Sequence, residues 1–251
     1  MNPLDISHFE RCLNTLDRGL ALYQAAAAGS LDADMYRSVC VKEFELLVEV
    51  AGKLLKKKLR PYFASNQEAE RLTYKNVFRH AARCGLLPLD VAERWLGTAI
   101  FATAPPTNTG PITPTRPWPY CPPLPPMPTP CSRPCLSKSF IPMLLQPRHR
   151  AMLDEILGRV LPPTAEVWAY GSRVTGEAHE ASDLDLVIRG SNLEPLPIQR
   201  LSLLREMLSE SNLPILVDIH DWATLPVSFH ERILARYEVL RPARPEAVTA
   251  A

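Results

Sequence analysis

Apolar residues in the first part of the chain recur every three or four positions, which is the spacing of an amphipathic α-helix. One such stripe runs from residue 4 to 28, where Gly29 and Ser30 interrupt it. A second stripe runs from residue 32 to 59, and Asp32 is its expected N-cap. The stripe positions are Ile6, Phe9, Leu13, Leu16 and Leu20, then Phe44, Leu47, Val48, Ala51, Leu54 and Leu55.

Two further helices complete a helical region that ends near residue 97. The third is expected over Tyr74–Cys84 and ends at Gly85, because glycine readily takes the left-handed conformation of a helix C-cap. The fourth begins near Pro88. The sequence therefore predicts an all-α, up-and-down helical bundle over residues 1–97.

After residue 148 short apolar runs alternate with helical stretches, which is the pattern of a domain that combines strands and helices. We expect this second domain to cover residues 148–243 and the fold class of the whole chain to be α+β. The expected helices are 152–161, 196–209 and 229–237, and the expected strands are 167–170, 184–188, 215–219 and 239–240.

The segment between these regions, residues 98–147, holds fifteen of the 26 prolines and no aspartate or glutamate. Dense proline removes backbone donors and excludes helix interiors, so the segment cannot build a core. We expect a disordered or extended linker. A proline-rich site that docks a partner is the alternative.

Composition excludes several classes of protein. The 251 residues carry a net charge of +1, which is not the basic balance of a nucleic-acid-binding protein. No apolar run reaches eighteen residues and no signal peptide begins the chain, so we expect a cytoplasmic protein that does not contact a membrane. Cys131 and Cys135 lie four apart without a second Cys or His pair to complete a zinc site. We expect the six cysteines to be free thiols.

Two aspartates open the strand expected at 184–188. Asp183 and Asp185 are two residues apart, so in a strand both carboxylates point to the same side. Two like charges at that distance repel one another, and a divalent cation would resolve the repulsion. Mg²⁺ prefers oxygen ligands and is usually held by a few carboxylates together with substrate phosphates.

A turn of small residues, Gly171-Ser172, follows the strand expected at 167–170. Glycine allows the backbone to approach a phosphate closely, and Ser172 offers a hydroxyl and an amide where a helix begins. A phosphate-binding turn about ten residues before a metal-binding pair of carboxylates is the layout of a nucleotidyl-transfer site.

This stretch resembles the signature of the polymerase-β-like nucleotidyltransferase superfamily, in its minimal nucleotidyltransferase (MNT) branch. The resemblance implies an α/β domain with a small mixed sheet. It also implies Gly171, Ser172 and Arg173 as nucleotide-binding residues, ATP as substrate, and two Mg²⁺ ions held by catalytic carboxylates. The matching positions are Tyr170, Gly171, Ser172, Arg173, Gly176, Ser182, Asp183, Asp185 and Leu186.

A third carboxylate is expected from the strand at 215–219. Asp218 lies among apolar residues, and because a lone buried carboxylate is costly, we expect it to join Asp183 and Asp185 as a catalytic metal ligand. Asp221 is the alternative, although its place at the strand end suits a turn cap. His220 and His230 are not expected to be ligands, because Mg²⁺ prefers oxygen.

Residues 1–97 are similar to the HEPN family, whose members are small helical proteins known as nucleotidyltransferase substrate-binding proteins, many of them paired with an MNT protein as toxin and antitoxin. That family places Arg, four to six residues, His, one residue and Tyr on its last helix, where Arg and His cleave RNA and Tyr receives AMP. This chain has no Arg or His between Leu96 and Thr115, so the bundle is incomplete and no HEPN active site is assigned. The similarity rests on 44–46, 53–55, 75–79 and 85–86.

The genetic code suggests where the missing motif lies. When the reading frame is shifted from the last base of the Gly97 codon, the triplets across Thr98–Thr109 permit Arg, four residues, His, one residue and Tyr. We therefore hypothesise that residues 98 to about 142 are an out-of-frame reading of a HEPN toxin's last helices, fused to an MNT frame.

The resemblance implies a Mg²⁺-dependent enzyme that transfers AMP from ATP to a hydroxyl of a HEPN toxin, and so acts as its antitoxin. The expected partners are a HEPN-type protein and a nucleoside triphosphate, in a homo- or hetero-oligomer. One alternative is a nucleotidyltransferase that modifies a small molecule such as an aminoglycoside. Another is a catalytically silent fusion or assembly module.

Overall fold

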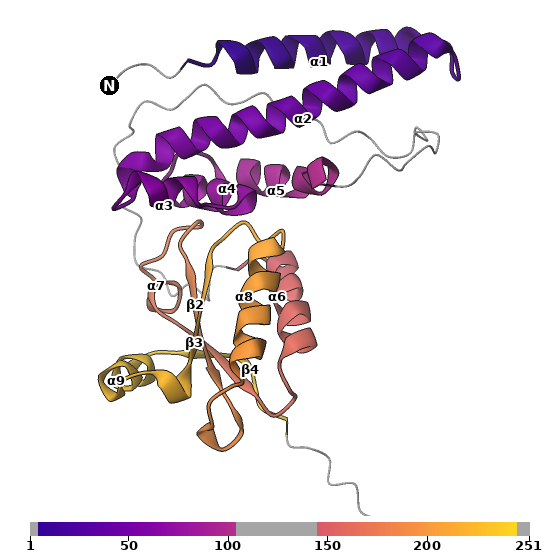
Figure 1. Cartoon of the computed structure of the whole chain (residues 1–251). Helices are drawn as coiled ribbons and strands as arrows, with labels where there is room; N and C mark the ends of the chain where they lie inside the picture. Colours follow the sequence, from indigo (N-terminus) through magenta and orange to yellow (C-terminus); the bar gives the residue numbers. More distant parts are fainter. Residues whose placement is uncertain (1–4, 104–144, 245–251) are drawn as a thin grey trace, which may run out of the picture. The chain divides into compact units, whose positions relative to one another are not determined.

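The computed structural model describes residues 5–103 and 145–244 and shows two compact units (Figure 1). Among the described residues, one unit contains 5–78 and 97–103, and the other joins Arg79–Leu96 to 145–244. Most of the predicted linker 98–147, with the out-of-frame hypothesis that concerns it, lies outside the described residues.

The first unit is built on a hairpin of two long helices, α1 (Ser7–Ala25) and α2 (Leu31–Leu59) (Figure 1). Both helices were predicted, and their apolar stripes form the buried side of the pair. The N-cap of α2 is Ser30, whose hydroxyl accepts a hydrogen bond from Ala33 N at 3.2 Å, and not Asp32 as predicted. Asp32 lies instead in the first turn, where its charge suits the helix dipole. The buried stripe contains Phe9, Cys12 and Leu16 from α1, and Cys40, Phe44, Leu47 and Val48 from α2.

Short elements follow the hairpin. They are η1 (Arg60–Tyr62), α3 (Asn66–Glu70), α4 (Tyr74–Arg83) and α5 (Leu89–Thr103). The chain turns after α4 at Gly85, which has a φ of +69° and confirms the predicted glycine cap. Helix α5 continues six residues past the predicted domain boundary at 97.

The second unit contains a four-stranded mixed sheet in the order β3-β2-β1-β4. Strand β1 (Glu166–Tyr170) pairs antiparallel with both β2 (Leu184–Arg189) and β4 (Glu238–Arg241), whereas β3 (Val217–Asp221) runs parallel to β2. The sheet confirms the predicted α+β class with a small mixed sheet. The third strand was predicted at 215–219 and is found two residues later, at Val217–Asp221, so it includes Asp221.

Helices cover both faces of this sheet (Figure 1). Helices α6 (Pro147–Val160) and α8 (Ile198–Glu210) pack on the aliphatic face, where Leu153, Leu186 and Leu204 are fully buried. Helix α9 (Val227–Ala235) packs on the opposite face, which is aromatic and includes Trp168, Tyr170, Val187, Trp222 and Ile233. The elements η2 (Ser191–Leu193) and η3 (Trp222–Thr224) are single turns in the connections.

Residues 79–96, assigned to the helical domain from sequence, pack inside the second unit. The guanidinium of Arg79 is buried and donates hydrogen bonds to the carbonyls of Leu208, Ser209, Ser211 and Leu213, at 2.8–3.1 Å. These carbonyls lie at and beyond the C-terminus of α8, where helix carbonyls lack partners within the helix. Burial lowers the pKa of Arg79 to about 10, which leaves it charged at neutral pH. Arg79 therefore fastens α4 to α8.

Two sequence expectations about environment can be compared with the structure. Cys12, Cys40 and Cys84 are free thiols, as expected, while the other three cysteines lie outside the described residues. Within 5–103 and 145–244, no helix combines the length and apolar character needed to cross a bilayer.

Candidate active site

Carboxylates from two adjacent strands meet on the aromatic face of the sheet. Asp185 of β2 pairs with Tyr170 of β1 on one side and with Asp218 of β3 on the other. Residues in register across a sheet point to the same face, and Asp183, two positions before Asp185, shares that side. The structure thus places the three aspartates that the sequence proposed as metal ligands on the same side of two adjacent strands.

The turn after β1 approaches the same carboxylates. Gly171 has φ 79° and ψ −158°, a backbone conformation that residues other than glycine rarely adopt. The four-residue helix α7 (Ser172–Thr175) starts at the next residue. A β-carbon built on Gly171 would collide with Asp185 Oδ2 and lie 3.1 Å from Asp185 Cγ. Glycine is therefore required here to admit the Asp185 carboxylate as well as to shape the turn.

Arg173, predicted to bind the nucleotide, is buried under the loop that joins α7 to β2. Its Nε and Nη2 donate to Ser182 O at 2.9 and 2.7 Å, and Nη2 also donates to Glu180 O at 2.7 Å. The side chain is 2% exposed. Arg173 therefore holds the carbonyls that immediately precede Asp183, and its role in nucleotide binding stays a prediction.

The electrostatics of the site disfavour three free carboxylates. Burial raises the pKa of Asp185 above its ordinary value, and the charges of Asp183 and Asp218 raise it further. Burial likewise raises the pKa of Asp183, although the Arg83 guanidinium opposes that shift. The pKa of the Tyr170 hydroxyl is also raised, by burial and then by Asp185 and Asp218. Burial and the neighbouring carboxylates thus disfavour the ionised forms of Asp183 and Asp185, and a nearby cation would favour them.

Asp183 has one oxygen paired and one oxygen without a partner. Its Oδ2 lies 3.1 Å from Arg83 Nη1, at the end of α4, in an ion pair that is partly exposed. Its Oδ1 is buried and accepts no hydrogen bond from any residue in the described part of the chain. Sequence reasoning did not find Arg83, because the pair joins positions a hundred residues apart and no local pattern marks it.

The two candidates for the third carboxylate differ in a way that the sequence did not predict. Asp218, expected to be buried, has a side chain that is 67% exposed. Asp221 is the buried one: it faces the aliphatic side, opposite Ile188, and accepts hydrogen bonds from Leu196 N at 2.8 Å and Ala223 N at 3.1 Å. Asp221, the alternative candidate, therefore caps the turn that follows β3. Asp218 is the candidate that lies beside Asp185 in the sheet.

Aromatic rings border the carboxylates. His220, on the same side of β3 as Asp218, lies with Nε2 3.7 Å from Asp218 Oδ2, and its ring neighbours Tyr170 and Phe229. His230 lies apart from the carboxylates, stacked on Trp222 and within 2.8 Å of its carbonyl oxygen.

The donor set fits a hard divalent cation. All three carboxylates offer oxygen, and the buried Asp183 Oδ1 lacks a partner that a metal would supply. Within residues 5–103 and 145–244, no three or more Asp, Glu, His or Cys side chains are already gathered closely enough to hold a metal. The oxygens are therefore of the right kind, on one face, and not in a preformed cage.

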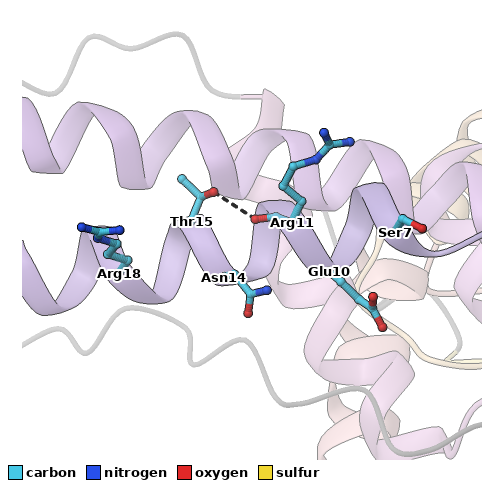
Figure 2. A pocket seen from close by; sticks show the side chains of 6 residues that line it. All are labelled: Ser7, Glu10, Arg11, Asn14, Thr15 and Arg18. Carbon is cyan, nitrogen blue, oxygen red and sulfur yellow. Dashed lines mark hydrogen bonds between the residues drawn. The ribbon is translucent and has the colours of Figure 1, made fainter.

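A shallow polar hollow elsewhere offers no comparable chemistry. It measures about 510 Å³, and the described residues that line it all lie on one face of α1 (Figure 2). Figure 2 shows Thr15 Oγ1 donating to the Arg11 carbonyl, within the helix itself. The lining residues are Ser7, Glu10, Arg11, Asn14, Thr15 and Arg18.

Two comparisons with known proteins agree with this geometry. A family described as "Polymerase beta, Nucleotidyltransferase" matches residues 160–243, which contain β1 to β4 and the three aspartates. The chain is also similar to a protein from Haemophilus influenzae named "Probable protein adenylyltransferase MntA". The two are 41% identical over 103 residues, which are 41% of this chain and 88% of that protein.

Proposed function

Because this chain belongs to the polymerase β nucleotidyltransferase family, we propose that it transfers AMP from ATP to a hydroxyl group of a HEPN-type toxin and thereby neutralises it. The observation that carries the proposal is the register of Asp185 with Asp218, beside the turn at Gly171. Carboxylates on one face and a phosphate-binding turn against them are the parts that nucleotidyl transfer requires.

The carboxylates would hold divalent metal. Asp183 and Asp185 would be the shared ligands, since both are partly buried and burial raises the pKa of each carboxyl above its ordinary value. Asp218 is the more exposed ligand and would also receive the proton of the acceptor hydroxyl. Bound Mg²⁺ supplies charge stabilisation at the α-phosphate and at the leaving pyrophosphate.

The remaining residues position the nucleotide. Ser172 presents a hydroxyl at the turn after β1, where the triphosphate would lie, and Gly171 keeps that turn close to Asp185. Arg173 ties the turn to the backbone at Ser182, so the phosphate-binding and metal-binding segments keep a fixed spacing. In the transfer the acceptor oxygen bonds to the α-phosphorus, and the bond from that phosphorus to pyrophosphate breaks.

The choice of a protein as acceptor rests on two supports. The relative from Haemophilus influenzae is named a protein adenylyltransferase. The first 97 residues of this chain, moreover, resemble the HEPN family, and the described part of this region is helical. A small molecule such as an aminoglycoside remains the alternative acceptor, and a catalytically silent fusion the alternative to an enzyme of this specificity.

The test is transfer of label from ATP carrying ³²P at the α-phosphate, with Mg²⁺. Acceptors are an intact HEPN protein, the same protein with its motif tyrosine changed to phenylalanine, and an aminoglycoside. We expect label on the intact protein alone, and none when Asp185→Asn replaces the wild type. Label on the aminoglycoside would establish the alternative acceptor. No transfer to any acceptor would support the silent fusion.

A further inference from the structure

A cationic side chain of the protein itself contacts one of the predicted metal ligands. Arg83 Nη1 lies 3.1 Å from Asp183 Oδ2, so the charge of this carboxylate is already partly balanced. About half of the Arg83 side chain is exposed and a quarter of that of Asp183, which means that the pair can open without disturbing a core. The Arg83 guanidinium and a divalent metal would therefore compete for the Asp183 carboxylate.

The position of Arg83 is set one helical turn earlier. Arg79 and Arg83 are four residues apart on α4 and so lie on the same face of the helix. Arg79 is 3% exposed and donates to four carbonyls near the end of α8, which is a large anchor for a single side chain. With that anchor in place, α4 positions the half-exposed side chain of Arg83 beside Asp183.

Electrostatic interactions should change the position of Arg83 when a nucleotide binds. A guanidinium and a divalent cation on the same carboxylate repel one another, whereas a triphosphate attracts both. Guanidinium groups bind phosphate oxygens well, because their donors form a planar fork.

We propose that Arg83 is a built-in gate on the metal site: it occupies Asp183 in the nucleotide-free enzyme, and it moves to the phosphates when metal and nucleotide bind together. This inference rests on the proposed function, since it assumes that Asp183 and Asp185 are metal ligands. The gate weakens metal binding in the absence of nucleotide and strengthens nucleotide binding in the presence of metal. A free enzyme would thus carry little metal until its substrate brings it.

Removal of the guanidinium has opposite effects on the two affinities, and this separates a gate from general damage. In Arg83→Ala, Mn²⁺ should bind the nucleotide-free protein about three- to fivefold more tightly, which corresponds to the loss of one partly exposed ion pair. The same variant should bind α,β-methylene-ATP in saturating Mn²⁺ several-fold more weakly. Mn²⁺ binding is read from its electron paramagnetic resonance signal and nucleotide binding from calorimetry, so neither measurement depends on turnover.

The matched control is Arg94→Ala. Arg94 is an exposed arginine on α5 that pairs with Asp90, four residues before it. Its replacement should leave the affinities for Mn²⁺ and for nucleotide unchanged. Arg83→Lys keeps the charge and should leave Mn²⁺ affinity near that of the wild type. Circular dichroism confirms that each variant is folded.

Two kinds of failure are distinguishable. If the wild type binds Mn²⁺ in a way that Asp185→Asn abolishes, yet Arg83→Ala does not tighten Mn²⁺ binding, the gate is wrong and the metal site stands. If Asp185→Asn binds Mn²⁺ as the wild type does, with and without nucleotide, the proposed function is wrong, and so is the gate that rests on it. Weakening of both affinities in Arg83→Ala would also overturn the gate, because it indicates a structural role.

Discussion

The carboxylate of Asp185 occupies the space that a side chain on residue 171 would need. The glycine of the phosphate-binding turn and the aspartate of the metal site are therefore one steric unit, although fourteen positions separate them in the sequence. Moving either one moves the other. This contact explains how β1 and β2 hold a phosphate-binding element and a metal ligand at a fixed distance.

Gly171→Ala should remove metal binding as well as transfer. A β-carbon would push the Asp185 carboxylate away, and the backbone conformation at this position costs a non-glycine residue about 1–3 kcal/mol. The measurement is Mn²⁺ affinity together with the midpoint of urea unfolding. Gly176→Ala is the control: its φ of +81° is also positive, but nothing lies within 4 Å of the added methyl group. That variant should lose about 1 kcal/mol of stability and keep Mn²⁺ binding. Equal Mn²⁺ binding by both variants would contradict the steric link.

Asp218→Asn and Asp221→Asn should fail in different ways. Asp218 is exposed and faces Asp185, so its replacement should cost about a hundredfold or more in transfer with little change in stability. Asp221 accepts two backbone hydrogen bonds in a buried position, so Asn, which cannot accept both, should cost about 1–3 kcal/mol in unfolding free energy. The folded fraction of that variant should still be active. The reverse outcome would move the third ligand to Asp221.

Asp185→Asn should make the metal-free protein more stable at neutral pH while it abolishes transfer. The pKa of Asp185 in the folded state lies above the ordinary 3.8, because of burial and the two neighbouring aspartates. The folded state therefore binds this proton more tightly than the unfolded chain, and ionisation lowers stability as the pH rises above about 3.8. The advantage of Asn should be absent below that pH and complete once the pH exceeds the raised pKa.

Thermal unfolding of both proteins from pH 3 to pH 8 tests this sign. Mg²⁺ should then raise the midpoint of the wild type and leave that of Asp185→Asn unchanged, because a metal stabilises the state that binds it. As a control, Asp90→Asn changes an exposed carboxylate paired with Arg94 and should show no comparable gain. A less stable Asp185→Asn protein at neutral pH would show that the carboxylate is satisfied in some other way.

The sequence predicted correctly those features that depend on the spacing of neighbouring residues. The interval of two between Asp183 and Asp185 predicts a shared side, and the apolar runs around them predict the strands that the structure contains. The glycine after α4 likewise predicts where that helix ends. In each case the physical cause acts over a few neighbouring residues and can be read from the residue types themselves.

The sequence was less informative where the cause is a distant residue. Apolar neighbours suggested that Asp218 is buried, but strand residues alternate between faces, and the Asp218 side chain lies on the face away from the aliphatic core and is 67% exposed. The buried carboxylate is Asp221, whose partners at Leu196 and Ala223 come from separate connections. The contacts of Arg79 and Arg83 join α4 to residues about 100 or more positions later, and no periodicity within α4 reveals them.

Cleavage between residues 98 and 147 should leave the two halves of the chain bound to one another. The proline-rich composition of that segment predicts that a protease at low concentration cuts there. Residues 79–96, however, belong to the same compact unit as the C-terminal residues. Arg79 binds the end of α8, and Glu93 pairs with Arg148 at 2.7 Å and with His149 at 3.0 Å.

Size-exclusion chromatography after cleavage tests this association, because the two fragments should elute together from the wild type. In Arg79→Ala the carbonyls of Ser209, Ser211 and Leu213 lose the guanidinium donor, at a cost of about 1–3 kcal/mol for each group left buried without a partner. The fragments of that variant should separate at low micromolar concentration, while those of Arg94→Ala should stay together. Separation of the wild-type fragments would mean that residues 79–96 do not dock on the second unit. Co-elution of the Arg79→Ala fragments would mean that the buried guanidinium is not what holds them.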